Sequence, residues 1–292
     1  MPYPLAMPLY RLHGSHELIA PTMIAALDGW VDAGSAATSA AAQLAGDGDP
    51  VATFNPDLVY DYRARRPTLH IMSGRPGTLD WPALQIRHRR LGDRDLLVLT
   101  GPEPDFRWKE LSDDLVELAQ SLGVAEWISL GAIPAAVPHT RPVPVMGTES
   151  RRGLLRASVN PGPTGLLRVP AAAISVIDIA VATSGIPAVG YFAQIPHYVS
   201  GPYPLAAVEL LKTMERHLAE EIDTSGLQGE ADAMLVRLSA AAAADDTTRD
   251  YVSRLEAMVD EARLPSGDDL ISDIERFLRE QGGPGNGGAE LG

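Results

Sequence analysis

Cysteine is absent from the sequence, which excludes disulfides, thiolate nucleophiles and thiolate metal sites together. Basic residues are in the minority, 24 against 38 acidic residues, and the formal net charge of −14 opposes binding to nucleic acid or to anionic lipid. The apolar stretch at 19–27 is closed by Asp28 and is too short to cross a bilayer, and residues 1–10 have no basic signal-peptide region. We therefore expect a cytoplasmic protein without a nucleic-acid or membrane partner.

Common catalytic motifs are also missing. The sequence has no Gly-x-x-x-x-Gly-Lys-Ser/Thr phosphate loop, no Gly-x-Ser-x-Gly nucleophile elbow and no His-Glu-x-x-His metal helix. Its seven histidines are scattered, so a preformed zinc site has little support. We expect no cofactor and no metal.

The clearest structural signal is a strand–helix–strand unit over residues 95–131. A continuous apolar run at 95–100 is typical of a buried parallel strand, and 126–131 repeats the pattern. Between them, leucines at helical spacing predict an amphipathic helix that ends at Gly123. This unit predicts an α/β fold with a right-handed crossover. Further strands are predicted at 21–27, 51–55, 68–72, 84–88 and 188–195. Helices are predicted at 35–45, with Ser35 as the N-cap, and at 170–184. The segment 132–150 is predicted to form a surface loop or edge strands.

The C-terminal third has a different composition. Helical periodicity begins near residue 204, and residues 205–281 hold 18 acidic against 8 basic side chains, a local net charge of −10. Glycine dominates 282–292. The sequence therefore predicts an α/β core at 8–204, an acidic helical extension at 205–281 and a disordered glycine-rich tail at 282–292.

Polar residues follow the first strand and the central strand, where open α/β sheets place their ligand crevices. Asp28 and Asp32 are suited to bind a hard cation or to act as acid and base, although such residues more commonly cap the following helix and hydrogen-bond the turn. After the central strand, Glu103, Arg107 and Trp108 form a candidate anion site, or else a salt-bridged helix start with the tryptophan packed on the core.

Two later loops contribute the remaining candidates. His139 and Arg141 lie in a proline-rich loop whose rigidity suits an anion site, an oligomer contact or a stiff connector. His197 and Tyr198 end the last predicted core strand and are placed to face the same crevice. A histidine at a strand end is more often a hydrogen-bonded structural residue than a catalyst.

Four segments of the chain, taken in order, carry a resemblance to a known family. They are Ala26-Leu-Asp-Gly-Trp-Val-Asp-Ala-Gly34, Gly101-Pro-Glu-Pro-Asp-Phe-Arg-Trp108, Val137-Pro-His-Thr-Arg-Pro142 and Gly190-Tyr-Phe-Ala-Gln-Ile-Pro-His-Tyr198. These segments resemble the PAC2 (proteasome assembly chaperone 2) family, and the acidic helical extension resembles its actinobacterial branch. The resemblance implies a phosphorylase/hydrolase-like α/β fold with a mostly parallel mixed sheet flanked by helices, a relation to proteasome assembly chaperones, and homo-oligomers such as trimers, but no known reaction. Some relatives dock on the proteasome through a final hydrophobic-Tyr-any tripeptide, whereas this chain ends Glu290-Leu291-Gly292, so such docking is not expected.

Two functions remain in competition. The favoured one is a non-catalytic oligomeric scaffold or chaperone acting on another protein complex, with the proteasome as the partner that the resemblance suggests. The alternative is a small-molecule hydrolase or phosphorylase that uses the strand-end crevice, an argument from fold alone. An enzyme should gather the candidate side chains around one pocket, whereas a scaffold should bury apolar loop residues at a subunit interface.

Overall fold

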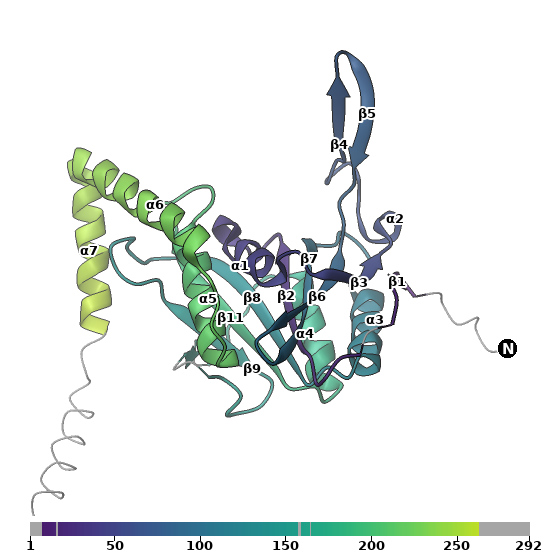
Figure 1. Cartoon of the computed structure of the whole chain (residues 1–292). Coiled ribbons are helices and arrows are strands. Elements are labelled where there is room, and N and C mark those ends of the chain that lie inside the picture. Colours follow the sequence, from purple (N-terminus) through teal and green to yellow (C-terminus); the bar gives the residue numbers. More distant parts are fainter. Residues whose placement is uncertain (1–7, 16, 157–158, 164, 263–292) are drawn as a thin grey trace, which may run out of the picture.

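Four parallel strands form the centre of a nine-stranded sheet in the computed structural model, which describes residues 8–262 except 16, 157–158 and 164 (Figure 1). Each central strand carries an apolar run because both of its faces are covered by helices. The central strands, in spatial order, are β7 (Arg94–Pro102), β2 (Thr22–Asp28), β8 (Glu126–Ala135) and β11 (Ala188–Pro196). The prediction of an α/β fold with a mixed, helix-flanked sheet is confirmed.

Antiparallel strands flank the parallel centre, and their share is larger than the sequence suggested. Four of the eight neighbouring pairs are parallel. The β6–β7 connection explains part of the difference: Leu91 pairs with Arg94 across a two-residue Gly92-Asp93 turn, too short for a crossover. The flanking strands are β6 (Gln85–Leu91), β3 (Asp49–Phe54) and β1 (Tyr10–Leu12) on one side, and β9 (Val145–Glu149) and β10 (Asn160–Pro161) on the other.

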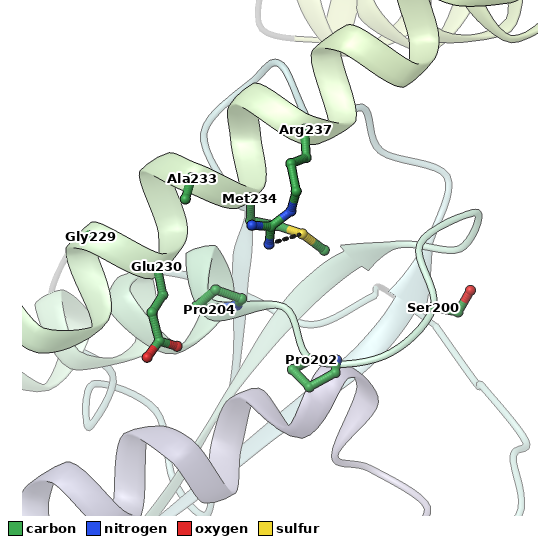
Figure 2. A pocket seen from close by; sticks show the side chains of 8 residues that line it. All are labelled: Ser200, Pro202, Pro204, Gly229, Glu230, Ala233, Met234 and Arg237. Carbon is green, nitrogen blue, oxygen red and sulfur yellow. Dashed lines mark hydrogen bonds between the residues drawn. The ribbon is translucent and has the colours of Figure 1, made fainter.

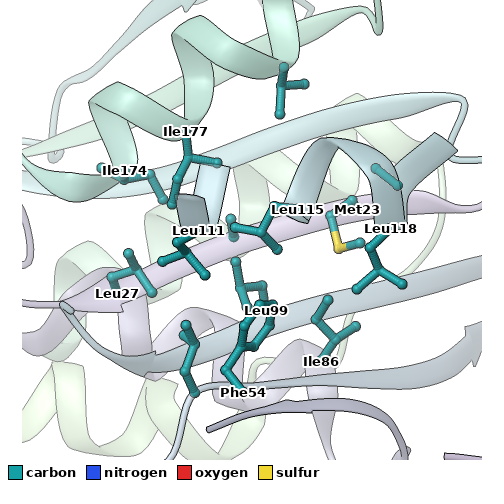
Figure 3. Close-up of a cluster of buried hydrophobic side chains, with 14 of the residues drawn as sticks. Met23, Leu27, Phe54, Ile86, Leu99, Leu111, Leu115, Leu118, Ile174 and Ile177 are labelled. Carbon is teal, nitrogen blue, oxygen red and sulfur yellow. The ribbon is translucent and has the colours of Figure 1, made fainter. Parts of the chain in front are cut away.

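Two hydrophobic cores lie on opposite faces of this sheet. Side chains alternate along β2, so Met23, Ala25 and Leu27 join one core while Ile24 and Ala26 join the other. Figure 3 shows the first core, in which Leu111 and Ile174 pack over the sheet from two helices. The first core is covered by α3 (Trp108–Ser121) and α4 (Ala173–Thr183), and the second by α1 (Ala36–Ala45) and α5 (Pro204–Leu218).

The C-terminal helices extend away from the sheet. Helix α6 (Ser225–Ala244) packs against α5 and projects outward, and α7 (Asp246–Ala262) turns back from the outer end of α6 at a steep angle (Figure 1). Although α5 falls in the stretch assigned to the extension, Leu210, Leu211 and Met214 are fully buried in the second core. The α/β core therefore includes α5. The last part of the predicted helical extension, 263–281, and the predicted tail at 282–292 lie outside the described residues.

A β-hairpin projects from the opposite side of the molecule (Figure 1). Strand β4 (Thr68–Met72) was predicted, and β5 (Arg75–Asp80) pairs with it as a separate two-stranded sheet. The short elements α2 (Pro56–Val59) and η1 (Ala33–Ser35) complete the chain. Over the residues that the structure covers, no helix combines the length and the apolar character needed to cross a membrane.

Candidate functional site

The nine predicted site residues all follow the carboxyl ends of the parallel strands, and the structure separates them into two groups. Asp28, Asp32, Glu103, Arg107 and Trp108 follow β2 and β7. His139, Arg141, His197 and Tyr198 follow β8 and β11. Within the described chain, no side-chain hydrogen bond or ion pair joins a predicted residue of one group to one of the other.

Asp32 caps helix α1 from within the β2–α1 loop. Its side chain is buried, and Oδ1 accepts hydrogen bonds from the backbone N–H groups of Ala37 at 2.8 Å and Thr38 at 3.2 Å. The Thr38 hydroxyl donates to Oδ2. Ser35, the predicted N-cap, has a left-handed φ of 49° and makes no capping bond. Burial raises the pKa of Asp32, although the Thr38 and Ala37 hydrogen bonds oppose the shift.

Glu103 joins two loops to the start of a helix. Its Oε1 accepts from the Ala173 N–H of α4 at 2.7 Å, and its Oε2 accepts from the Trp30 N–H at 3.1 Å. A Cβ at Gly29 would lie 2.4 Å from Oε2, so this position needs glycine. Both carboxylate oxygens of Glu103 are therefore committed to holding the backbone.

Asp28 is the most open acid of the first group. Its carboxylate lies 4.0 Å from the guanidinium of Arg65, which also lies 3.9 Å from Asp105. Arg65 belongs to the segment that leads into the projecting hairpin. These long, partly solvated ion pairs contribute little stability, and they connect the base of the hairpin to the strand edge.

Arg107 and Trp108 form the start of α3. Arg107 occupies the N-cap position with φ 59° and pairs with Glu110 at 3.1 Å, one helical turn along. The Trp108 indole N–H donates to the Pro104 carbonyl at 2.6 Å, and its ring packs against the first core. This arrangement matches the structural alternative for both residues.

The second group is centred on the contact between His139 and Tyr198. The Tyr198 hydroxyl accepts a hydrogen bond from the His139 backbone N–H and donates one to Nδ1, each at 2.9 Å. In the neutral ring this places the proton on Nε2, which is buried and has no partner among the described residues. Burial lowers the pKa of His139, against a smaller opposing effect of the Glu256 charge, so the imidazole is neutral at pH 7.

His197 connects the strand ends to α7. Its Nδ1 lies 3.0 Å from the Ala135 carbonyl oxygen, which requires the proton on Nδ1, and its Nε2 accepts from the Tyr251 hydroxyl at 3.0 Å. The rings of His197, Tyr198 and Tyr251 meet edge to face at centroid distances of 5.7 to 6.2 Å. This histidine therefore makes structural contacts on both nitrogens.

Arg141 forms the strongest ionic contact with α7. Its guanidinium donates to both oxygens of Asp260, at 2.9 and 2.7 Å, and to Glu256 at 3.2 Å. The hydrogen bonds to Asp260, together with the charges of Asp260 and Glu256, raise the pKa of Arg141. Arg141, which the sequence suggested as an anion ligand, thus binds two carboxylates of its own chain.

We expect Arg141→Ala to loosen α7 without unfolding the α/β core. Removing a bidentate ion pair of this exposure should speed amide hydrogen exchange across 246–262 about fivefold. Hydrogen-exchange mass spectrometry measures the change, and β2 and β8 amides should exchange as in the wild type. Arg249→Ala removes a solvated ion pair within α7 and serves as the matched control, with little change expected. Equal exchange in the two variants would show that Arg141 does not hold the helix.

Two cavities lie beside helix α6, and one of them adjoins the second group. One, of about 290 Å³, lies between the 139–143 loop, α5 and α6, and of the predicted site residues only His139 and Arg141 line it. Another, of about 550 Å³, lies between α6 and the 200–204 loop, where Met234 and Arg237 reach toward Pro202 (Figure 2). The described part of the chain contains no group of three His, Asp or Glu side chains able to hold a metal ion.

Asp178 is a titratable residue that sequence reasoning missed. It lies on the inner side of α4, where the Trp127 indole donates to its Oδ1 at 2.9 Å and the Ser129 hydroxyl donates to the same oxygen. Burial raises the pKa of Asp178 to about 6, despite these hydrogen bonds. A third cavity, of about 300 Å³, adjoins this carboxyl group.

These observations define an α/β protein whose polar strand-end residues mainly connect loops to one another and to a C-terminal helical extension. The chain belongs to the PAC2 family, whose family model matches residues 26–242. A comparison with functionally curated proteins finds no match.

Three solved structures are similar over most of the chain. A Mycobacterium tuberculosis proteasome-assembly chaperone homologue is 34% identical, with a TM-score of 0.72, over 79% of this chain and 99% of its own. A PAC2 family protein from Streptomyces avermitilis is also 34% identical, with a TM-score of 0.72, over 80% and 99%. A Corynebacterium glutamicum protein of unknown function is 30% identical, with a TM-score of 0.80, over 86% and 97%. A Pyrococcus furiosus proteasome activator shares the fold at 16% identity.

Proposed function

We propose that this chain is a non-catalytic, homo-oligomeric scaffold of the cytoplasm that acts as a chaperone in the assembly of another protein complex. The projecting β4–β5 hairpin is the observation that carries the oligomeric part of this proposal. The similarity to a proteasome-assembly chaperone homologue supports the proteasome as the partner complex.

The hairpin presents an apolar face to solvent. Leu69 and Ile71 are two residues apart on β4 and so point to the same side, and Leu79 lies opposite Leu69 on β5. Their exposed fractions are 47, 62 and 46%. The His70 Nε2 and Asp80 Oδ2 atoms lie 2.6 Å apart and form a polar pair on the hairpin. A two-stranded hairpin is marginally stable alone in water, so this face favours a partner that covers it.

A second copy of the chain is the partner that the charges favour. The hairpin, 68–80, holds one Arg and one Asp, so its formal charge is zero on a chain of net charge −14. Two copies therefore meet there without the repulsion that their acidic surfaces impose elsewhere. Arg63 and Arg66 precede the hairpin and supply positive charge for an acidic neighbouring surface.

We expect the triple substitution Leu69→Ser, Ile71→Ser and Leu79→Ser to dissociate the oligomer. The wild type should sediment at two or more times the monomer mass, with a trimer as the expected form, and the variant as a monomer, because the apolar contact is lost. Sedimentation velocity measures both species. His70→Thr with Asp80→Asn alters only the polar pair and should leave the mass unchanged. A monomeric wild type, or an unchanged mass in the triple variant, would contradict the hairpin interface.

The chaperone role has a separate test. Purified proteasome α subunits should assemble faster, or to a higher yield, when the wild type is added, and native mass spectrometry should detect the intermediate complex. Deletion of 282–292 tests the glycine-rich tail: an effect that persists in the deletion variant would assign it to the rest of the chain. Unchanged assembly with no complex would remove the proteasome from the proposal while leaving the oligomer intact.

A further inference from the structure

A carboxyl group and an aromatic ring face a cavity on the α4 side of the sheet. The cavity, of about 300 Å³, lies between α4, β9 and the first half of β11. Asp178 and Phe192 line it together with three hydroxyl side chains, Thr148, Ser150 and Ser175. It adjoins the start of β11, whereas the predicted site residues follow the opposite, carboxyl ends of the strands.

The hydrogen bonds of Asp178 are unequally shared between its two oxygens. Both the Trp127 indole and the Ser129 hydroxyl donate to Oδ1, and the indole also lies 2.9 Å from the Ser129 oxygen. Oδ2 accepts no hydrogen bond from any residue that the structure describes. No Lys, Arg or His is among the residues that line the cavity. One oxygen is thus fixed by the protein, and the other is left for a ligand.

Two glycines hold the Phe192 ring in place. A Cβ at Gly131 would lie 2.4 Å from the Phe192 ring, and a Cβ at Gly190 would lie 2.7 Å from it. The ring therefore lies across the bare backbone of β8 and β11 at the wall of the cavity. An aromatic face beside a carboxylate is a favourable environment for an organic cation.

The second carboxylate of the cavity adds to its negative potential. Glu149 Oε2 accepts from the Leu155 N–H at 3.0 Å and the Leu154 N–H at 2.9 Å, which lowers the pKa of Glu149 and keeps it ionised. Asp178, in contrast, has its pKa raised to about 6 by burial, so a bound cation would relieve the cost of its ionised form. These two are the titratable side chains that line the cavity, and the nearby Arg152 charge also lowers the pKa of Glu149.

We propose that this cavity binds a small primary amine as its ammonium ion, with Asp178 Oδ2 accepting its hydrogen bond and the Phe192 ring contacting the cation and its apolar part. The cavity volume is at the lower end of the range for ligand sites, which limits the ligand to about one ring or a short chain. The exposed side chain of Ile179 lines the cavity and gives the apolar part of such a ligand a surface to contact.

Benzylamine is the probe that tests this site in the full chain. Saturation-transfer NMR titrations should detect its binding to the wild type, and Asp178→Asn should weaken binding about tenfold or more. Asparagine retains an acceptor for Trp127 and Ser129, so this variant should fold. Binding should also tighten as the pH rises through about 6, where Asp178 loses its proton while the amine keeps its own.

Matched controls separate the site from general attraction to an acidic protein. Asp113→Asn, on the exposed side of α3, should bind benzylamine as the wild type does. Benzyl alcohol and benzoate, which have the same ring without the cation, should bind at least about tenfold more weakly than benzylamine. Equal binding by Asp178→Asn and the wild type, by benzyl alcohol and benzylamine, or no binding of benzylamine at all, would overturn the proposal.

Discussion

Asp178→Asn is expected to stabilise the protein at neutral pH by about 2 to 3 kcal/mol. The reason is the burial of an ionised carboxylate against Trp127 and Ser129 without a cation, which raises the pKa of Asp178 to about 6 from its usual 3.8. The difference of about two pKa units corresponds to about 3 kcal/mol of unfolding free energy. Asparagine keeps the Oδ1 acceptor and has no charge to desolvate.

The raised pKa of Asp178 also predicts how the stability of the wild type changes with pH. Between the unfolded and folded pKa values the native state holds the proton, so the wild type loses stability as pH rises through about 6, and the variant does not. In urea titrations, the difference in unfolding free energy between Asp178→Asn and the wild type should therefore grow by about 2 to 3 kcal/mol from about pH 4 to about pH 8. A constant gap across this range would contradict the raised pKa. A residue that costs stability while contacting a cavity is typical of a binding site.

The sequence predicts the parallel centre of the fold well, for a physical reason. Strands buried on both faces need continuous apolar runs, and 95–100 and 126–131 have them. Strand β5 gives no such signal, because Arg75-Pro76-Gly77 has the composition of a turn and its pairing with β4 comes from the hairpin alone. Likewise, the 132–150 segment is part strand, since β8 runs to Ala135 and β9 begins at Val145.

The predicted site residues lie along the strand ends, but their hydrogen-bond and ion-pair partners were not visible in the sequence. The loop of Arg141 was predicted to be an anion site, an oligomer contact or a stiff connector, and the acceptors of Arg141, Glu256 and Asp260, lie more than a hundred residues later. Asp178 was missed because α4 is apolar around most of its circumference, so no periodic face shows on which side a single aspartate lies. Only the pairing of α4 with Trp127 and Ser129 of β8 shows it.

The contacts of the strand-end residues bear on the choice between scaffold and enzyme. An enzyme was expected to gather Asp28, Asp32, Arg107, His139 and His197 around one pocket. Of these, only His139 lines the cavity of about 290 Å³, and Asp32 is occupied by backbone N–H groups. Glu103 and Arg141 are likewise occupied by other parts of the chain. Side chains already satisfied in this way hold loops in place, which favours a scaffold whose loops must keep one shape.

Asp32 offers the sharpest test of that structural role. Asp32→Ala should lower the unfolding free energy by about 2 to 3 kcal/mol, since it removes the cap of α1 and leaves the buried N–H of Ala37 and the half-buried N–H of Thr38 without their acceptor. Asp32→Asn keeps an acceptor and should cost less than about 1 kcal/mol. Burial raises the pKa of Asp32, so ionisation of this side chain costs stability in the folded protein. The unfolding free energy of Asp32→Asn should therefore increase relative to that of the wild type as the pH rises.

Urea titration of the two variants separates a hydrogen-bonding role from a role of the charge. If the acceptor holds the helix, Asp32→Ala unfolds at a lower urea concentration than Asp32→Asn, and Asp32→Asn retains the sedimentation coefficient of the wild type. If the charge itself is needed, Asp32→Ala and Asp32→Asn unfold at the same urea concentration, below that of the wild type. The first outcome assigns Asp32 to the frame that holds the β2–α1 loop beside Glu103 and Trp30. The second outcome would make this strand edge a candidate catalytic or binding site again, because a buried charge that costs stability is retained where a functional site needs it.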